Sequence, residues 1–144
     1  MFLVGCSVKP VAVDFNHLKR PGSPNYYLAC PKDSCNIQPD IESPCFDVSI
    51  LKLQDTWKKM IANAVRYSSL SHNDKRDQIQ YVQRSLILRF PDYVTVRFLP
   101  LTQESSTLAI LSYSKYGHSD FGVNKKRVDS LLSSLKDDLP LCQK

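Results

Sequence analysis

The sequence predicts a two-layer α+β domain, in which an antiparallel sheet of about four strands carries two helices on one face. Two kinds of periodicity support this fold class: several stretches alternate apolar and polar residues, and two others place apolar residues at helical spacing. The links between the later strands are short, which favours antiparallel pairing. We therefore expect the order strand, helix, strand, strand, strand, helix.

The strands are predicted from alternation with a period of two residues, which places every second side chain on the same face of a sheet. Pro91 and Asp92 are expected to form the turn between the second and third strands. The predicted strands are residues 46–50, 77–90, the run around Val94, Val96 and Phe98, and residues 107–113.

The helices are predicted from apolar residues that recur at i, i+3, i+4 and i+7. The first is expected over roughly residues 55–69, with Asp55 as its N-cap and a loop at 71–74 after it. Its apolar positions are Trp57, Met60, Ile61, Ala64 and Val65. The second lies near the C-terminus and shows the same spacing at Val128, Leu131, Leu132 and Leu135.

Residues 7–44 carry most of the prolines of the chain and show no clear periodicity, so we expect this segment to be irregular. The domain organisation that follows is a lipoprotein-type N-terminus and tether over residues 1–24. A single α+β domain over residues 25–144 then begins with a cysteine-rich loop.

The stretch Leu3-Val4-Gly5-Cys6 has the form in which a bacterial lipoprotein signal ends, where the cysteine becomes the lipid-bearing N-terminus. Only five residues precede Cys6, whereas a secretory signal needs an apolar region of about 7–15 residues, so this interpretation requires upstream sequence. On this basis we predict a lipid on Cys6, a membrane anchor, and a domain that faces the periplasm or the exterior of the cell envelope. The alternative is a chance match in a cytoplasmic protein.

The number of cysteines agrees with this predicted location in the cell envelope. With Cys6 lipidated, the four cysteines that remain form an even set that fits two disulfides. They are Cys30, Cys35, Cys45 and Cys142. Three pairings are open, and we expect Cys142 to tie the C-terminus to the loop between Cys30 and Cys45. Their spacing does not form the two tight cysteine pairs of a zinc site, and we predict no metal and no cofactor.

The segment from Ser112 to Arg127 has the most unusual composition in the chain. Glycines flank an acid, which suits a backbone with positive φ, and lysines and an arginine lie close to the predicted start of the last helix. Such a site can hold a carboxylate or phosphate, and the alternative is a rigid structural turn. The residues concerned are Ser112, Ser114, Lys115, Gly117, Asp120, Gly122, Asn124 and Arg127.

The same segment resembles the signature of the bacterial and plastid family known as domain of unknown function 1499. That signature reads S-x-S-R, then G-x-x-D-x-G-x-N, then a basic triplet; Lys115 stands where arginine is usual, which removes a planar bidentate donor. The resemblance extends to residues 81–100 and to Trp57, and so spans roughly residues 25–136. It implies a small domain that is often exported or membrane-associated, and it implies no particular chemistry.

No arrangement in the sequence favours catalysis. His118, Ser119 and Asp120 are adjacent, and neighbours in a turn point apart, whereas a triad must converge in space. The net charge of +5 is spread along the chain, so we predict no nucleic-acid partner. We expect an envelope lipoprotein that acts as a non-catalytic module for an envelope protein or for an anionic or apolar ligand. The alternative is an enzyme or anion-binding protein that acts at the Ser112–Arg127 turn.

Overall fold

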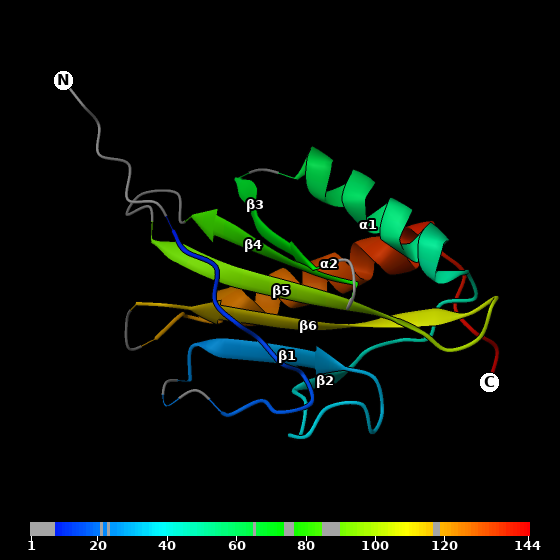
Figure 1. Cartoon of the computed structure of the whole chain (residues 1–144), viewed down its shortest axis with the longest axis horizontal. Coiled ribbons are helices and arrows are strands. Elements are labelled where there is room, and N and C mark those ends of the chain that lie inside the picture. The colour runs from blue at the N-terminus through cyan, green and yellow to red at the C-terminus, as the bar shows by residue number, and fades with distance from the viewer. Residues whose placement is uncertain are drawn as a thin grey trace.

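A computed structural model of the chain describes residues 8–20, 22, 24–64, 66–73, 77–84, 90–116 and 119–144. It contains a six-stranded sheet in the order β2-β1-β6-β5-β4-β3 and two helices behind it (Figure 1). The strands are β1 Tyr26–Cys30, β2 Ile41–Glu42, β3 Tyr67–Asn73, β4 Gln78–Arg84, β5 Pro91–Pro100 and β6 Ser106–Ser114. The helices are α1 Ile50–Asn63 and α2 Val123–Asp138. The predicted α+β class with two helices is confirmed, and the number of strands is larger than predicted.

The hairpin of β5 and β6 is the centre of the sheet. Its antiparallel register runs from Asp92 opposite Ser114 to Pro100 opposite Ser106. On one side β4 and β3 follow as antiparallel neighbours, and on the other side β1 pairs antiparallel with β6. Because β2 pairs parallel with β1, the sheet is mixed rather than purely antiparallel.

The prediction of a strand at residues 46–50 is wrong. Phe46 forms only isolated bridges with Ser106 and Leu141, and α1 begins at Ile50. The Ser49 side chain accepts a hydrogen bond from the backbone N–H of Lys52 at 3.2 Å, which satisfies one of the free donors of the first turn. This cap starts the helix earlier than the Asp55 cap that we expected.

The expected extension of the first helix to residue 69 is also wrong, and so is the expected loop at 71–74 over its described residues 71–73. The helix ends at Asn63, Arg66 has φ 66°, and the chain then enters β3 over Tyr67–Asn73. The apolar spacing of the predicted helix ends at Ala64 and Val65, and the residues from Tyr67 onward pair with β4 instead. Tertiary pairing commonly overrides such local patterns.

Two strands lie within the segment expected to be irregular. The β1 residues Leu28, Ala29 and Cys30 are all buried, so this strand shows no alternation of apolar and polar residues. Leu28 and Cys30 contact one core and Ala29 the other, because both faces of β1 are covered. A short strand buried on both faces cannot be recognised from a period of two.

The larger core lies between the sheet and the two helices, which run on the same face (Figure 1). At its centre Trp57 of α1 is fully buried, and its indole N–H donates to the Tyr81 hydroxyl at 3.2 Å. The Trp57 ring meets Phe98 edge to face at 5.9 Å. The helix residues in this core are Leu53, Trp57, Ile61, Val128, Leu131, Leu132 and Leu135.

The opposite face of the sheet is covered by residues 8–20, the segment that we assigned to a tether (Figure 1). Phe15 is 2% exposed and packs in a core with Leu28 and Leu111. The Gln80 side chain accepts from the N–H of Val11 at 2.8 Å and donates to its carbonyl at 2.9 Å, as a paired strand would. This segment therefore belongs to the folded unit.

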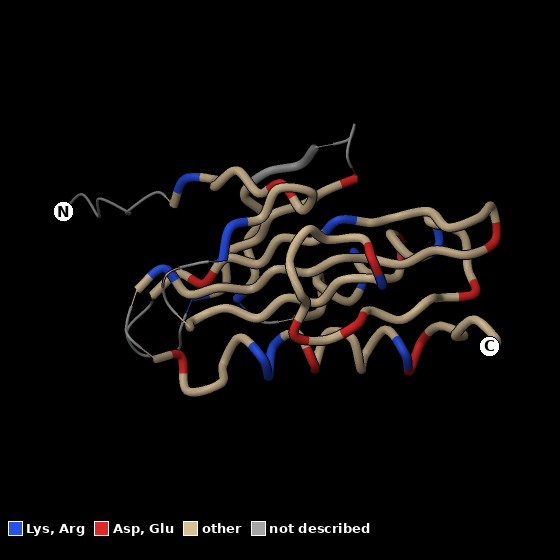
Figure 2. Tube along the Cα trace, turned by 90° about the horizontal axis from the view of Figure 1, so that it is seen from below, with Lys and Arg blue, Asp and Glu red and all other residues tan. Residues whose placement is uncertain are grey.

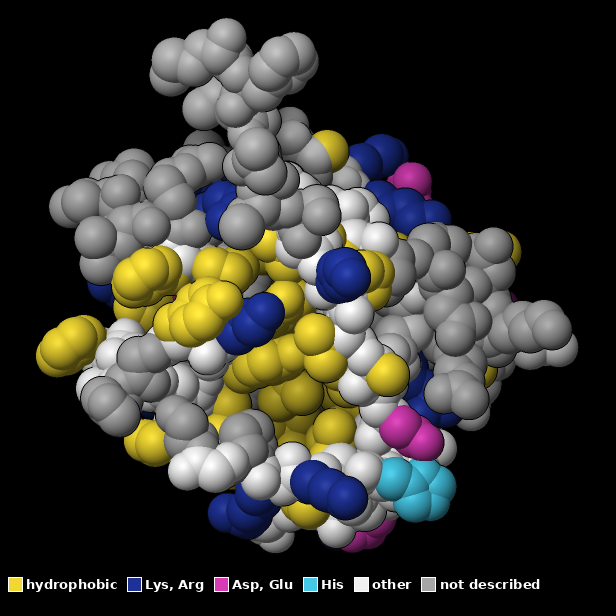
Figure 3. All heavy atoms as spheres, turned by 60° about the vertical axis from the view of Figure 1, so that its left-hand side comes forward, with side chains coloured by type: hydrophobic (Ala, Val, Ile, Leu, Met, Phe, Trp, Pro, Cys, Tyr) yellow, Lys and Arg dark blue, Asp and Glu magenta, His cyan; other side chains and the backbone are white. Residues whose placement is uncertain are grey.

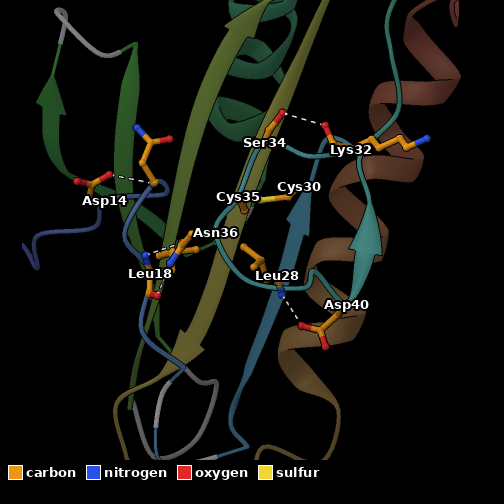
Figure 4. The surroundings of a disulfide bond; sticks show 10 residues. Asp14, Leu18, Leu28, Cys30, Lys32, Ser34, Cys35, Asn36 and Asp40 are labelled. Atoms are coloured by element: carbon orange, nitrogen blue, oxygen red, sulfur yellow. Dashed lines mark hydrogen bonds between the residues drawn. A yellow bond between two sulfur atoms is a disulfide. The ribbon is translucent and has the colours of Figure 1, made fainter.

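Two disulfides form among Cys30, Cys35, Cys45 and Cys142, as predicted. One joins Cys30 to Cys35, and beside it the Asn36 side chain makes two hydrogen bonds to the backbone of Leu18 (Figure 4). The other joins Cys142 to Cys45, at the end of the loop to which we expected the C-terminus to be tied. In the part of the chain that the structure describes, neither helix is long and apolar enough to cross a bilayer.

Candidate functional site

Several polar residues of the Ser112–Arg127 segment converge at the start of α2, around the guanidinium of Arg127. That group donates to Asp92 Oδ2 at 2.6 Å, to Asn124 Oδ1 at 2.8 Å and to Ser112 Oγ at 3.0 Å. Its Nε donates to Gln83 Oε1 at 2.6 Å. The side chains of Arg127 and Asp92 are only 8% and 11% exposed. The positive charge of Arg127 is therefore neutralised inside the protein.

Asn124 connects this ion pair to the rest of the fold. It is fully buried, and its Oδ1 accepts from the Ser112 hydroxyl at 2.7 Å. Its Nδ2 donates to Ser114 Oγ at 2.9 Å, to Asp120 Oδ2 at 2.8 Å and to the carbonyl of Asn25 at 3.2 Å. One amide thus joins α2 to β6, to the turn before the helix, and to the residue that precedes β1.

The turn before α2 has an unusual backbone. Phe121 has φ 51° and Gly122 has φ 78°, so two successive residues are in the left-handed region. Asp120 Oδ1 accepts from the N–H of Gly122 at 2.9 Å, which stabilises this conformation.

Of the other predicted site residues, Lys115 lies apart from the Arg127 network, with its amine 5.5 Å from the centre of the Tyr116 ring. Gly117, His118 and the predicted lipidation site Cys6 lie outside the described residues.

Two partners of Arg127 were not predicted from the sequence. Asp92 was expected in a turn, but it is the second residue of β5 and pairs in register with Gln83 of β4. One feature of the sequence could have indicated this pairing: the carboxylate of Asp92 stands beside the apolar residues of β5. Such a position suits the partner of a buried arginine, because a buried charge is usually paired. The sequence distance between Asp92 and Arg127 hid this pairing.

A groove of about 1160 Å³ lies between α1 and α2, above the edge of the sheet formed by β3 and β4. The two helices are antiparallel, since the end of α1 and the start of α2 meet near Tyr67, Gln83 and Arg127. The groove residues at this end include the cations Arg66 and Lys126, and at the other end they include Lys52, Asp137 and Asp138. Met60, Ala64 and Leu131 contribute apolar surface to it.

Two titratable groups in the groove are shifted. Burial raises the pKa of the Tyr67 phenol, although the charge and hydrogen bond of the nearby Arg127 act in the opposite direction, so Tyr67 keeps its proton at neutral pH. The hydrogen bond from Lys59, together with its charge, lowers the pKa of Asp55, which it meets at 3.0 Å. The negative charge of Asp55 is thus largely compensated within its own helix.

Stability should depend on the ionisation of Asp120. Burial acts to raise its pKa, but the hydrogen bonds from Asn124 and from the N–H of Gly122 outweigh it, and the pKa lies below the ordinary value of 3.8. A carboxyl with a lowered folded-state pKa stabilises the fold above pH 3.8, and this contribution is lost as the pH falls through the folded-state pKa. We expect the free energy of unfolding of Asp120→Asn, measured by urea denaturation, to fall less steeply below that pH than that of the wild type. Parallel curves for the two proteins would contradict this role.

A family model described as a protein of unknown function (DUF1499) matches residues 19–135 of the chain. No curated protein matches it. The matched stretch includes all six strands, α1 and the Ser112–Arg127 segment on which the resemblance was based. Because the match covers well over half of the sequence, the chain belongs to the DUF1499 family.

Proposed function

We propose that the protein is a non-catalytic binding module of the cell envelope, and that the groove between α1 and α2 binds a small amphipathic anion. The observation that carries this proposal is the uneven lining of the groove. Apolar side chains of Met60 and Leu131 lie along it, and one end has cations without a lining acid among the described residues. Such a groove suits a ligand with an apolar body and a carboxylate or phosphate head.

The charges at the ends of the groove support this orientation of the ligand. Arg127 is compensated by Asp92, so Arg66 and Lys126 supply the excess positive charge at the end where α2 begins. The acids Asp137 and Asp138 line the opposite end. An anionic head group should therefore bind beside Arg66 and Lys126, where the charges of both side chains are exposed to solvent.

The buried network supports a non-catalytic role. Asp120, Asn124 and Arg127 use their polar atoms to bond one another and the backbone, and Ser112 and Asn124 are fully buried. A general base or nucleophile must reach the substrate, typically within hydrogen-bond distance. The alternative of an enzyme that acts at the Ser112–Arg127 turn has less support for this reason.

We propose that the protein is located in the cell envelope and carries a lipid on Cys6. Two cysteine pairs at bonding distance support an oxidising compartment, where disulfides persist. The Leu3–Cys6 stretch supports cleavage and lipidation at that residue.

The intact mass of the protein made in its own host tests this localisation and the lipid on Cys6. We expect a chain cleaved before Cys6, with added acyl groups, whose four other cysteines react with an alkylating reagent only after reduction. A chain that retains Met1 and has five free thiols would overturn both the lipid and the compartment.

Ligand binding is tested with dansyl-undecanoic acid, a fluorescent fatty acid with an apolar chain and a carboxylate. We expect saturable binding to the wild type, and an affinity at least about tenfold weaker for the double variant Arg66→Glu and Lys126→Glu, since two attractive charges become repulsive. The control is Lys58→Glu with Lys136→Glu, which changes the net charge equally at exposed helix positions outside the groove. Equal weakening by both double variants would contradict the site.

A steric test avoids any effect of net charge. Ser130 and Ser133 are both exposed on α2, and only Ser130 lines the groove. We expect Ser130→Trp to block the probe and Ser133→Trp to bind it as the wild type does. Unchanged binding by Ser130→Trp would place the probe elsewhere.

A further inference from the structure

A cluster of exposed aromatic side chains lies at the end of the sheet where β5 and α2 begin. Phe90 is 46% exposed and Tyr116 is 53% exposed, and in the turn that enters α2 Phe121 is 93% and Val123 45% exposed; we call these four residues the aromatic patch. The rings of Phe90 and Tyr116 lie 5.8 Å apart, although they come from opposite ends of the central hairpin sequence. Figure 3, which brings this end of the molecule forward, shows hydrophobic side chains gathered there with Lys and Arg side chains among them.

Phe121, the most exposed ring of the patch, also has an unusual backbone conformation. Its φ of 51° is in the left-handed region, which glycine or asparagine adopts at far lower cost than an aromatic residue. The turn holds this conformation through hydrogen bonds from the N–H of Phe121 to Ser119 Oγ at 3.3 Å and from the N–H of Gly122 to Asp120. An aromatic ring held outward at a strained position points to a function for that ring.

Positive charge surrounds the aromatic patch. Lys115 lies against Tyr116, and Lys125 and Lys126 are exposed in the first turn of α2. The acids nearby are already engaged: Asp129 pairs with Lys125 at 2.5 Å, and Asp120 accepts hydrogen bonds within the turn. Among the described residues around the patch, the positive charges of Lys115 and Lys126 are thus not matched by an acid.

The described chain also begins at this end. The carbonyl of Lys9 accepts a hydrogen bond from the Tyr93 hydroxyl at 3.4 Å, and the Tyr93 ring stacks on Tyr113 at 5.2 Å. Tyr93 and Tyr113 lie in β5 and β6 next to the residues that bear the patch. Lys9 therefore lies on the same side of the domain as Phe90 and Tyr116.

We propose that the aromatic patch docks the domain onto the surface of an anionic lipid bilayer. Phenylalanine and tyrosine rings enter the head-group region, while lysines among them contact anionic lipid. Lysine is depleted in protein–protein interfaces, so the mixture of Phe121, Lys115 and Lys126 favours a bilayer over a protein partner. This contact does not depend on the groove ligand, and it is separate from the lipid proposed on Cys6.

The test uses the full chain without acyl groups and measures its sedimentation with vesicles. We expect binding to phosphatidylcholine vesicles that contain phosphatidylglycerol, weak binding to phosphatidylcholine alone, and release by salt. Phe121→Ser should lower the partition coefficient by about tenfold, because it removes one inserted ring. The matched control is Leu101→Ser. Leu101 is an exposed apolar residue that follows β5, at the opposite end of that strand from the patch. This substitution should change the partition coefficient less than about twofold.

A second measurement reports insertion directly. We expect the emission of a Phe121→Trp variant to shift to shorter wavelength and to be quenched by brominated lipid, and the emission of Leu101→Trp to be unaffected. The native Trp57 is fully buried and supplies a constant background.

Three results would overturn the proposal. Equal loss of binding in Phe121→Ser and Leu101→Ser would show general hydrophobic adhesion, and no binding of the wild type to anionic vesicles would exclude docking. A dimer in solution that Phe121→Ser converts to a monomer, without vesicle binding, would assign the patch to a second copy of the chain.

Binding of dansyl-undecanoic acid by Phe121→Ser shows that the groove is intact, so failure of docking and failure of the groove proposal are distinguishable.

Discussion

The buried ion pair between Arg127 and Asp92 is the interaction on which the arrangement of the other parts depends. An unpaired charge in this position would be costly, because removing one partner of a buried pair typically destabilises a protein by about 3–5 kcal/mol. Here the pair has further support from Gln83 and Ser112, so strands β4, β5 and β6 all bond to one residue of α2. Through Asn124 the network reaches Asn25, at the start of β1. The N-terminal half of α2 is thus fixed on the sheet by polar contacts rather than by apolar packing alone.

Fixing this end of α2 also positions the two proposed binding surfaces. The cationic end of the groove is formed where α2 meets Tyr67 and Gln83 (Figure 2 shows the charged positions along the Cα trace). The aromatic patch is formed by the turn that enters α2 and by the adjacent end of the central hairpin. Both surfaces therefore lie at one end of the molecule, and Val123 and Lys126 belong to the margins of both. A ligand released from a membrane surface would have a short path to the groove in this arrangement.

The sequence alone was sufficient for the parts of the fold with strong periodicity. The central hairpin showed alternation at Val94, Val96 and Phe98, and α2 showed helical spacing, and both were located correctly. By contrast, β1 is buried on both faces and β2 spans only Ile41–Glu42, so neither carries a periodic signal. The start of α1 was missed because the alternation over residues 46–50 was interpreted as a strand, although Ile50 and Leu53 stand at helical spacing before Trp57.

The candidate site was predicted in part for a similar reason. The motif from Ser112 to Arg127 is contiguous, and its unusual composition made it visible in the sequence. Asp92 and Gln83 reach Arg127 only through strand register, and the groove depends on how two helices lie across a sheet. Neither relation is encoded in local spacing, and both require the tertiary structure.

The most direct test of this account is a double-mutant cycle on the central ion pair, with Asp92→Asn, Arg127→Met and the double variant followed by urea denaturation. We predict that each single variant loses about 3–5 kcal/mol, and that the double variant loses much less than the sum, with a coupling energy of at least about 2 kcal/mol. Losses that add to within about 0.5 kcal/mol would show that the two residues act independently. In that case the ion pair would not organise the fold, and the positions of the groove and the aromatic patch would need another explanation.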